Sequence, residues 1–148
     1  MNAIQVLKED HDYVKKSYRA FQKLDPEEDL EEVQAIVKQV CAALKVHMRI
    51  EEEILYPAAR KALKDADLID EAEIEHESAK TLIRQLARLR PKDPKYAATF
   101  TVLCEYVDHH VKEEENEMFP KLRRARLNLA ALGKKLMQRK TRLAARSR

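Results

Sequence analysis

The stretch HMRIEEEILYP at residues 47–57 recurs as HVKEEENEMFP at residues 110–120, 63 residues further along the chain. Both copies begin with His and carry Glu four residues later, at Glu51 and Glu114. Both also end in an apolar residue, an aromatic residue and Pro. Self-similarity at a fixed period indicates a duplicated structural unit. The sequence therefore predicts two halves of similar structure.

A second histidine precedes each copy. His11 lies 36 residues before His47, and His76 lies 34 residues before His110. The residues before them are similar, LKED before His11 and AEIE before His76. Each upstream histidine is followed four residues later by a lysine, Lys15 or Lys80. Four of the five histidines thus occupy two equivalent pairs of positions.

The composition favours a helical protein of one domain. The chain has 148 residues and a single Gly, which leaves little material for tight turns and favours helix. We therefore predict an all-α fold. No apolar run approaches the ~20 residues of a membrane span, and the N-terminus does not resemble a signal peptide, so we expect a cytoplasmic protein. There Cys41 and Cys104 would stay reduced and pack as small hydrophobic side chains.

The net charge of +3 hides a division along the chain. Residues 121–148 hold 11 of the 29 Lys and Arg residues and no acid, which leaves 18 bases against 26 acids in residues 1–120, a net charge of −8. We therefore divide the chain into a bundle domain, residues 1–120, and a basic amphipathic C-terminal extension, residues 121–148. The extension could fold back on its own bundle. It could also bind an anionic partner: nucleic acid, a membrane surface or the acidic body of a second subunit.

Apolar side chains at three- and four-residue spacing predict four long helices. Their expected ranges are residues 3–24, 27–64, 67 or 70 to 89, and 94–120. Asp25 and Asp93, each followed by Pro, are predicted to cap the second and fourth helices, and Asp67 or Asp70 the third. Pro57 should kink the second helix or begin a fresh segment. Short connections between four long helices predict an antiparallel up-down-up-down bundle, with the basic extension as an additional helix.

The inward faces of these helices carry ionisable side chains at one level. The stripe of the second helix should consist of Ile36, Val40, Leu44, His47, Glu51 and Ile54. Residues i and i+4 lie about 40° apart around a helix, so His47 shares a face with Glu51, and His110 with Glu114. An unpaired buried carboxylate costs several kcal/mol, which a bound cation removes. Two cations suit the count best, with two His on each and both Glu between them. Such a donor set suits iron, with manganese or zinc as alternatives.

The pattern resembles that of the hemerythrin-like HHE cation-binding family: His, His-x-x-x-Glu, His, His-x-x-x-Glu on a four-helix bundle. The match covers residues 1 to about 120. The resemblance implies a non-haem di-iron centre, an oxo- or hydroxo-bridged pair. It makes His11 and His47 ligands of one iron, His76 and His110 ligands of the other, and Glu51 and Glu114 the bridges.

The chain departs from the oxygen-carrying hemerythrins at two places. Those proteins have a fifth ligand His where this chain has Lys80, and Asp in place of the second bridging Glu. The resemblance therefore implies a more open iron that binds or consumes oxygen, nitric oxide or peroxide, as in bacterial relatives with roles in stress. One alternative is an iron-binding or redox-sensing module that signals through the basic extension without catalysis. Another is a helical interaction protein without metal.

Several residues near the expected ligands admit two readings. His109 is assigned to the surface or to the surroundings of the ligands, because only His110 has the spacing of the first copy. Glu52 and Glu115 are expected to be solvated, with a place near the route by which metal enters as the alternative. Lys15 and Lys80 could gate the site or hold an anion, or simply extend their amines to water.

Aromatic residues lie at matching places too. Tyr56 and Phe119 are expected to pack, although a tyrosine near iron could also donate a proton or be oxidised. Tyr106 lies four residues before His110 and is the other candidate hydroxyl near the site.

Overall fold

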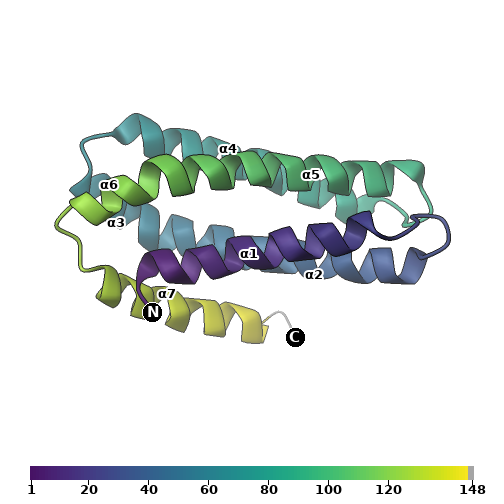
Figure 1. Cartoon of the computed structure of the whole chain (residues 1–148), viewed down its shortest axis with the longest axis horizontal. Helices are drawn as coiled ribbons and strands as arrows, with labels where there is room; N and C mark the ends of the chain where they lie inside the picture. Colours follow the sequence, from purple (N-terminus) through teal and green to yellow (C-terminus); the bar gives the residue numbers. More distant parts are fainter. Residues whose placement is uncertain (147–148) are drawn as a thin grey trace.

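The chain folds into an antiparallel four-helix bundle with a further helix along one side (Figure 1). The computed structural model describes residues 1–146. Its α-helices are α1 (Ala3–Gln22), α2 (Leu30–Ile50), α3 (Tyr56–Ala62), α4 (Ala66–Arg88), α5 (Pro94–Glu113), α6 (Phe119–Arg124) and α7 (Leu129–Arg146). Two π-helical turns, η1 (Glu51–Leu55) and η2 (Glu114–Met118), join α2 to α3 and α5 to α6. The described residues contain no strand, which confirms the all-α prediction.

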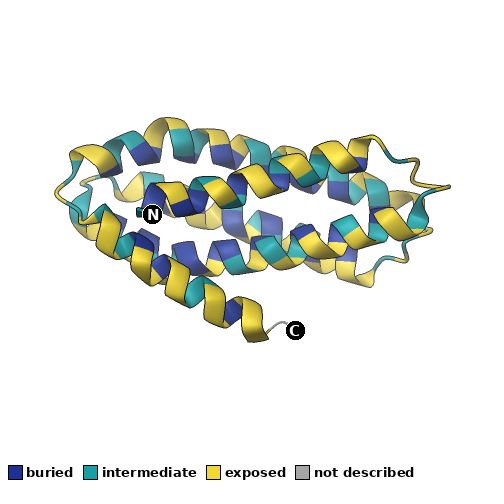
Figure 2. Ribbon diagram, turned by 60° about the horizontal axis from the view of Figure 1, so that its bottom comes forward, coloured by how far each residue is buried: buried dark blue, intermediate teal, exposed yellow. Residues whose placement is uncertain are grey.

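The four rods of the bundle pack pairwise around a common interior. α1 contacts α2 and α5, while α4 contacts α5 and α2. The buried residues of each helix face this interior, and the exposed residues face outward (Figure 2). This arrangement confirms the predicted bundle and gives each half of the sequence repeat one antiparallel helix pair.

The bundle core consists of two hydrophobic clusters separated by polar side chains. Along α1, Leu7 belongs to one cluster and Val14 to the other, with the buried His11 between them. Along α2, Leu44 and Ile50 are divided in the same way around His47. The two apolar clusters thus enclose the level at which the predicted ligands lie.

Two of the predicted N-caps are wrong. α2 begins at Leu30 with Asp29 at the N-cap, because Asp25 accepts hydrogen bonds from the backbone of Glu27 at 2.9 Å and Glu28 at 3.4 Å and so holds a turn there. α4 begins after Asp65, whose side chain accepts from the Leu68 backbone N–H at 3.2 Å, so neither Asp67 nor Asp70 is the cap. The predicted start of α5 is confirmed, with Asp93 as N-cap and Pro94 in the first turn.

The prolines of the repeated stretch begin fresh helical segments. Proline has no backbone N–H and its ring clashes with the carbonyl four residues earlier. A π-turn before each one, closed by the bond from Tyr56 N–H to the Glu51 carbonyl in η1, accommodates it. The extra residue in this turn rotates the helix face, so Leu55 is buried where Ile54 was expected. Ile36 is only partly buried but packs against the core, while its neighbour Val37 takes the buried position.

The basic C-terminal helix α7 lies along α1, α2 and η1. It passes so close to the N-terminus that a Cβ on Gly133 would lie 2.6 Å from the Asn2 carbonyl carbon. Arg139 pairs with Glu53 at 2.8 Å, and Lys140 with Asp10 at 2.5 Å. Of the fates considered for the extension, folding back on its own bundle is therefore observed. The break before α7 lies at residues 125–128, and the domain boundary at residue 120 stays a prediction.

No helix in the described part of the chain is long and apolar enough to cross a membrane.

Candidate metal centre

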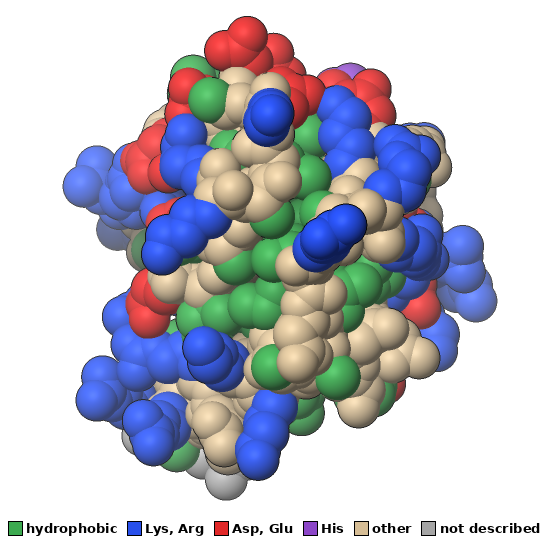
Figure 3. All heavy atoms as spheres, turned by 90° about the vertical axis from the view of Figure 1, so that its left-hand side faces the viewer, with side chains coloured by type: hydrophobic (Ala, Val, Ile, Leu, Met, Phe, Trp, Pro, Cys, Tyr) green, Lys and Arg blue, Asp and Glu red, His purple; other side chains and the backbone are tan. Residues whose placement is uncertain are grey.

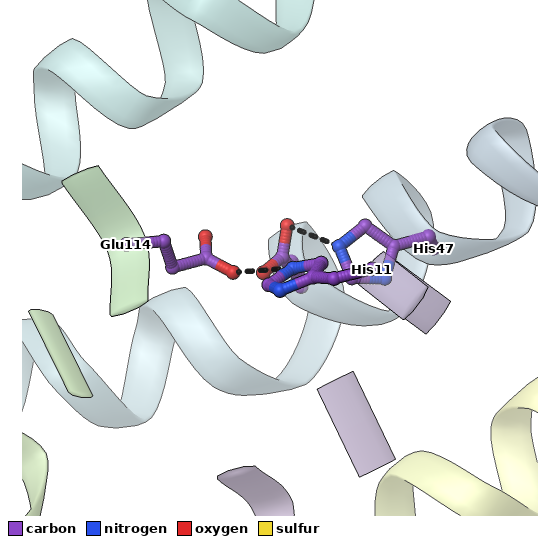
Figure 4. A group of neighbouring side chains, drawn as sticks. His11, His47 and Glu114 are labelled. Carbon is purple, nitrogen blue, oxygen red and sulfur yellow. Dashed lines mark ion pairs between the residues drawn. The ribbon is translucent and has the colours of Figure 1, made fainter. Parts of the chain in front are cut away.

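The six predicted ligands all point into the interior of the bundle. Their exposed fractions are 2% for His11, 6% for His47, 0% for Glu51, 2% for His76, 8% for His110 and 2% for Glu114. α1, α2, α4 and α5 each supply one histidine, and the glutamates open η1 and η2. Figure 4 shows His11, His47 and Glu114 directed toward one another.

The six side chains form two groups that share a glutamate. His11, His47, Glu51 and Glu114 make up one group, and His76, His110 and Glu51 the other, with donor atoms within 4.8 Å of one another in each. Glu51 Oε1 lies 3.2 Å from Nε2 of His47 and 3.0 Å from Nε2 of His76. Glu114 directs Oε1 to His11 and Oε2 to His110, both at 3.3 Å. Each carboxylate therefore reaches both histidine pairs.

Several of these buried atoms have no hydrogen-bond partner. They are Nε2 of His11, Nε2 of His110, Oε2 of Glu51 and Oε1 of Glu114. A buried donor or acceptor without a partner costs about 1–3 kcal/mol, and more for a charged group. Imidazole nitrogens and carboxylate oxygens are ligands for iron, manganese and zinc. Metal ions between the two groups would satisfy all four atoms, so these residues fit the predicted cations.

A carboxylate holds the outer nitrogen of every histidine in the site. Asp10 lies 2.8 Å from His47 Nδ1, Glu75 2.7 Å from His110 Nδ1, Glu115 2.7 Å from His11 Nδ1 and Glu52 2.7 Å from His76 Nδ1. We call these four residues the outer carboxylates. Each favours the tautomer that donates from Nδ1, which leaves the Nε2 lone pair for a cation.

Glu52 and Glu115 are only partly exposed to solvent and lie beside the candidate ligands, because each binds a histidine of the site. Asp10 and Glu75 were not predicted at all. A signal was present, since each directly precedes the upstream histidine of its repeat. Each nevertheless binds the histidine of the neighbouring helix, which only the register between helices determines.

The surrounding carboxylates favour protonated histidines while no cation is bound. Burial opposes the charge, yet Glu114 and Glu75 raise the pKa of His110 to about 10. The pKa values of His47 and His76 are raised too, against the effect of burial, by Glu51 and the outer carboxylates. Burial also disfavours a charged Glu114, but Glu51, His11 and His110 hold its pKa well below the usual value. A metal would replace these protons, so binding should release them.

Tyr56 contributes a hydroxyl group to the site, in addition to packing in the core. Its oxygen lies 3.0 Å from Glu114 Oε2, 3.3 Å from Glu51 Oε1 and 3.1 Å from His76 Nε2. Burial and both glutamates raise the pKa of Tyr56 well above its usual value, so it stays protonated. Phe119, its counterpart in the repeat, stacks on His11 with ring centroids 6.0 Å apart. The two halves of the site therefore differ by one hydroxyl.

An apolar cavity borders the histidines on the side away from Tyr56. Its lining includes the four ligand histidines, Tyr13, Tyr106 and a set of aliphatic side chains: Val14, Leu44, Met48, Ala79, Val107 and Val111. Tyr13 is 43% exposed, so the cavity extends toward the surface. The predicted position of Tyr106 near the site is thus observed.

The remaining predicted residues lie outside the ligand groups. Lys80 pairs with Glu52 at 2.8 Å and Glu77 at 3.2 Å. Lys15 lines a second pocket, which His11 also lines. His109 is 66% exposed and pairs with Glu113 at 3.0 Å, which confirms its surface reading.

The two cysteines are free thiols that pack in the core. Burial raises the pKa of Cys41 to about 11 and that of Cys104 to about 12. Neither thiol is therefore a reactive thiolate at neutral pH, in agreement with the packing role predicted for both.

Comparison with known proteins agrees with this site. A family model described as Hemerythrin HHE cation binding domain matches residues 2–127. The crystal structure of a hemerythrin HHE cation binding domain-containing protein, the Rv2633c homolog from Mycobacterium kansasii, superposes with a TM-score of 0.82 at 27% identity, over 97% of this chain and 87% of that one. The uncharacterized protein Rv2633c of Mycobacterium tuberculosis is 28% identical over 120 residues, 81% of this chain and 71% of that protein.

A DNA nickase of Nostoc sp. is 29% identical over 123 residues. The match takes in 83% of this chain but only 34% of the nickase, so this chain corresponds to about a third of that relative.

Proposed function

Because this chain belongs to the hemerythrin HHE cation-binding domain family, we propose that it is a non-haem di-iron protein that binds or consumes a small ligand: oxygen, nitric oxide or peroxide. One observation carries the proposal. The carboxylates of Glu51 and Glu114 each reach two histidines that belong to different groups. A carboxylate so placed can bridge two cations, which a single-metal site does not require.

In the proposed centre, His11 and His47 hold one iron, and His76 and His110 hold the other. Glu51 and Glu114 bridge the pair. Iron is favoured over manganese and zinc because a mixed imidazole and carboxylate set with open positions is typical of non-haem iron sites. The four buried atoms that make no hydrogen bond support this assignment, since two cations would satisfy all of them.

The residues around the centre suit an uncharged ligand. When bound, the iron pair would supply electrons and open coordination positions. The aliphatic side chains that line the cavity would give a route for a small apolar or weakly polar molecule. The Tyr56 hydroxyl, whose oxygen lies 3.0 Å from Glu114 Oε2, holds a proton that it can deliver within the site. A buried proton donor favours consumption of peroxide or nitric oxide over simple binding. We therefore expect the protein to consume one of these molecules during stress.

The first test is metal analysis of the purified protein, followed by rapid-mixing spectroscopy with peroxide, oxygen and nitric oxide in separate runs. The proposal expects about two irons per chain and a new charge-transfer band with turnover of at least one ligand. Protein that carries no metal after loading with Fe²⁺ would overturn it. A single iron per chain would overturn the bridged pair.

A second candidate function is sensing, in which the metal state controls an anionic partner through the basic extension. At the end of the bundle shown in Figure 3, Lys and Arg side chains surround a central apolar area. The exposed bases of α3, α6, α7 and the loops beside them that have no acidic partner in the described residues are Lys61, Lys64, Arg123, Arg124, Arg126, Lys134, Lys135, Arg142 and Arg146. Similarity to part of a DNA nickase makes a nucleic acid the partner of choice.

Fluorescence anisotropy with a labelled DNA duplex tests this second function. Binding should weaken steeply with salt, depend on Arg123, Arg124 and Arg126, and differ between metal-loaded and metal-free protein. Equal binding in both metal states would exclude sensing.

A cytoplasmic location is proposed for either function, because a reducing compartment keeps both thiols free.

A further inference from the structure

The surroundings of the candidate centre break the symmetry that its ligands obey. The repeat relates His11 to His76, His47 to His110 and Glu51 to Glu114, and the outer carboxylates follow the same relation. Lysines do not. Among the residues that the structure describes, only two of the four outer carboxylates pair with a lysine, and these two are not equivalent positions of the repeat.

The first of these lysines comes from the C-terminal helix. Lys140 Nζ lies 2.5 Å from Asp10 Oδ1, and Asp10 Oδ2 lies 2.8 Å from His47 Nδ1. The Asp10 side chain is only 13% exposed and that of Lys140 is 33% exposed. A chain of ammonium, carboxylate and imidazole therefore leads from α7 to the metal-facing nitrogen of His47.

The second lysine reaches the other histidine pair. Lys80 Nζ lies 2.8 Å from Glu52 Oε1, and Glu52 Oε2 lies 2.7 Å from His76 Nδ1. Within residues 1–146, no Lys or Arg pairs with the remaining outer carboxylates, Glu75 and Glu115. Each proposed metal position thus has one histidine with a lysine behind its carboxylate and one without.

We propose that Lys140 and Lys80 are positioning residues, one for each metal position, that hold the carboxylates of Asp10 and Glu52 against His47 and His76. This inference rests on the di-iron function proposed above. A carboxylate held by an ammonium keeps one rotamer, so it fixes the ring orientation and the Nδ1–H tautomer of its histidine. Loss of the ammonium would free the carboxylate to turn toward water and would leave the histidine less well aimed.

In this proposal, a side chain of α7 helps to orient a ligand of the metal centre. The helix covers Asp10 from outside the four-helix bundle and supplies the only Lys or Arg that this carboxylate contacts among the described residues. Lys80 has the corresponding role from within the bundle, on α4. The affinity of one metal position should therefore depend on the C-terminal helix, whereas that of the other should not.

The test is an anaerobic Fe²⁺ titration of metal-free full-length protein against a competing chelator. Lys140→Met should lower the affinity for one of the two irons by about 10-fold or more, which is a typical effect when the partner of a ligand histidine is disturbed. Lys80→Met should weaken the other by a similar factor, and the double variant should weaken both. Lys140→Arg, which keeps the charge and the donors, should restore binding.

Arg139→Met is the matched control. Arg139 is the neighbour of Lys140 and also pairs across to the bundle, but its partner Glu53 touches no histidine of the site. This variant should keep both affinities, and its metal-free form should unfold at a urea concentration similar to that of metal-free Lys140→Met. If Lys140→Met and Arg139→Met bind iron equally well, the inference is wrong while the di-iron function stands. Weakening of both irons by either single variant would also overturn it, whereas wild-type protein without bound iron would refute the proposed function itself.

Discussion

The hydroxyl of Tyr56 lies 3.0 Å from the Oε2 atom of Glu114, although the two residues are 58 positions apart. Tyr56→Phe should keep both metals, because no ligand changes. It should lower the free energy of unfolding by about 1–3 kcal/mol, since buried acceptors lose their donor. If Tyr56 supplies a proton, peroxide consumption should also fall by about 100-fold or more. The measurements are metal analysis, urea unfolding and peroxide turnover.

Tyr106→Phe serves as the control for this variant, because Tyr106 lines the cavity without a hydrogen bond to the ligands. It should behave as wild type in all three measurements. An unchanged turnover rate in Tyr56→Phe would exclude the proton-donor role.

Glu51→Ala should lose metal and stability together. The side chain is fully buried and lies within 3.2 Å of two histidines, so its loss removes a proposed bridge and leaves a cavity among charged groups. Metal analysis should give fewer than two irons per chain, and the loaded protein should lose most of the stabilisation that bound metal gives to wild type. Glu53→Ala, an exposed change two residues away, should keep both irons. A fully loaded Glu51→Ala would disprove the ligand assignment.

The convergence of the six buried His and Glu side chains could be predicted from sequence, because the spacing within one helical turn and the repeat determine which residues face the interior. His47 and Glu51 lie four residues apart, so any helix places them on one face, and the repeat supplies their counterparts. The outer carboxylates could not be predicted in this way. Asp10 binds His47, which lies 37 residues away and on another helix. That contact depends on how far two helices slide along each other, and no periodicity within one helix contains this information.

The π-turns escaped prediction for a related reason. Pro57 marks a disturbance of the helix, but a kink, a break and a widened turn all relieve the same steric clash. The widened turn rotates the following residues, which brings Tyr56 into the site and moves Ile54 partly outward. A prediction that assumes an unbroken helix therefore places Ile54 in the core, where the structure has Leu55.

The metal-free protein should lose stability at alkaline pH. The pKa of His110 in the folded state is about 10, above the unfolded value of about 6.5. Its contribution to the free energy of unfolding is therefore fully present below about pH 6.5 and is lost as the pH rises through about 10. His47 and His76 are shifted in the same direction. Urea unfolding at pH 6, 8 and 10 should show a steady decline.

Two controls isolate this effect. His110→Ala should flatten the decline, whereas His109→Ala, at an exposed position, should not change it. On the acid side the lowered pKa of Glu114 gives stability that is present above about pH 4.5 and lost as the pH falls below it. Metal-loaded protein should lack the alkaline decline, because metal replaces the protons. An equal decline in metal-free wild type and His110→Ala would contradict the assignment.

Gly133→Ala should destabilise the protein although alanine favours helix. The substitution gains about 1 kcal/mol in helix propensity. The added Cβ, however, would lie 2.3 Å from the Met1 carbonyl oxygen and 2.6 Å from the Asn2 carbonyl carbon, both backbone atoms that cannot swing aside. Relief requires α7 to move away from α1, which loosens the helix that carries Lys140. We expect a net loss of about 1–3 kcal/mol in the free energy of unfolding, together with weaker binding of one iron. Ala130→Gly, an exposed change on the same helix, should cost only about 1 kcal/mol and leave both irons bound. A Gly133→Ala variant as stable as wild type would mean that α7 does not pack against the N-terminus in solution.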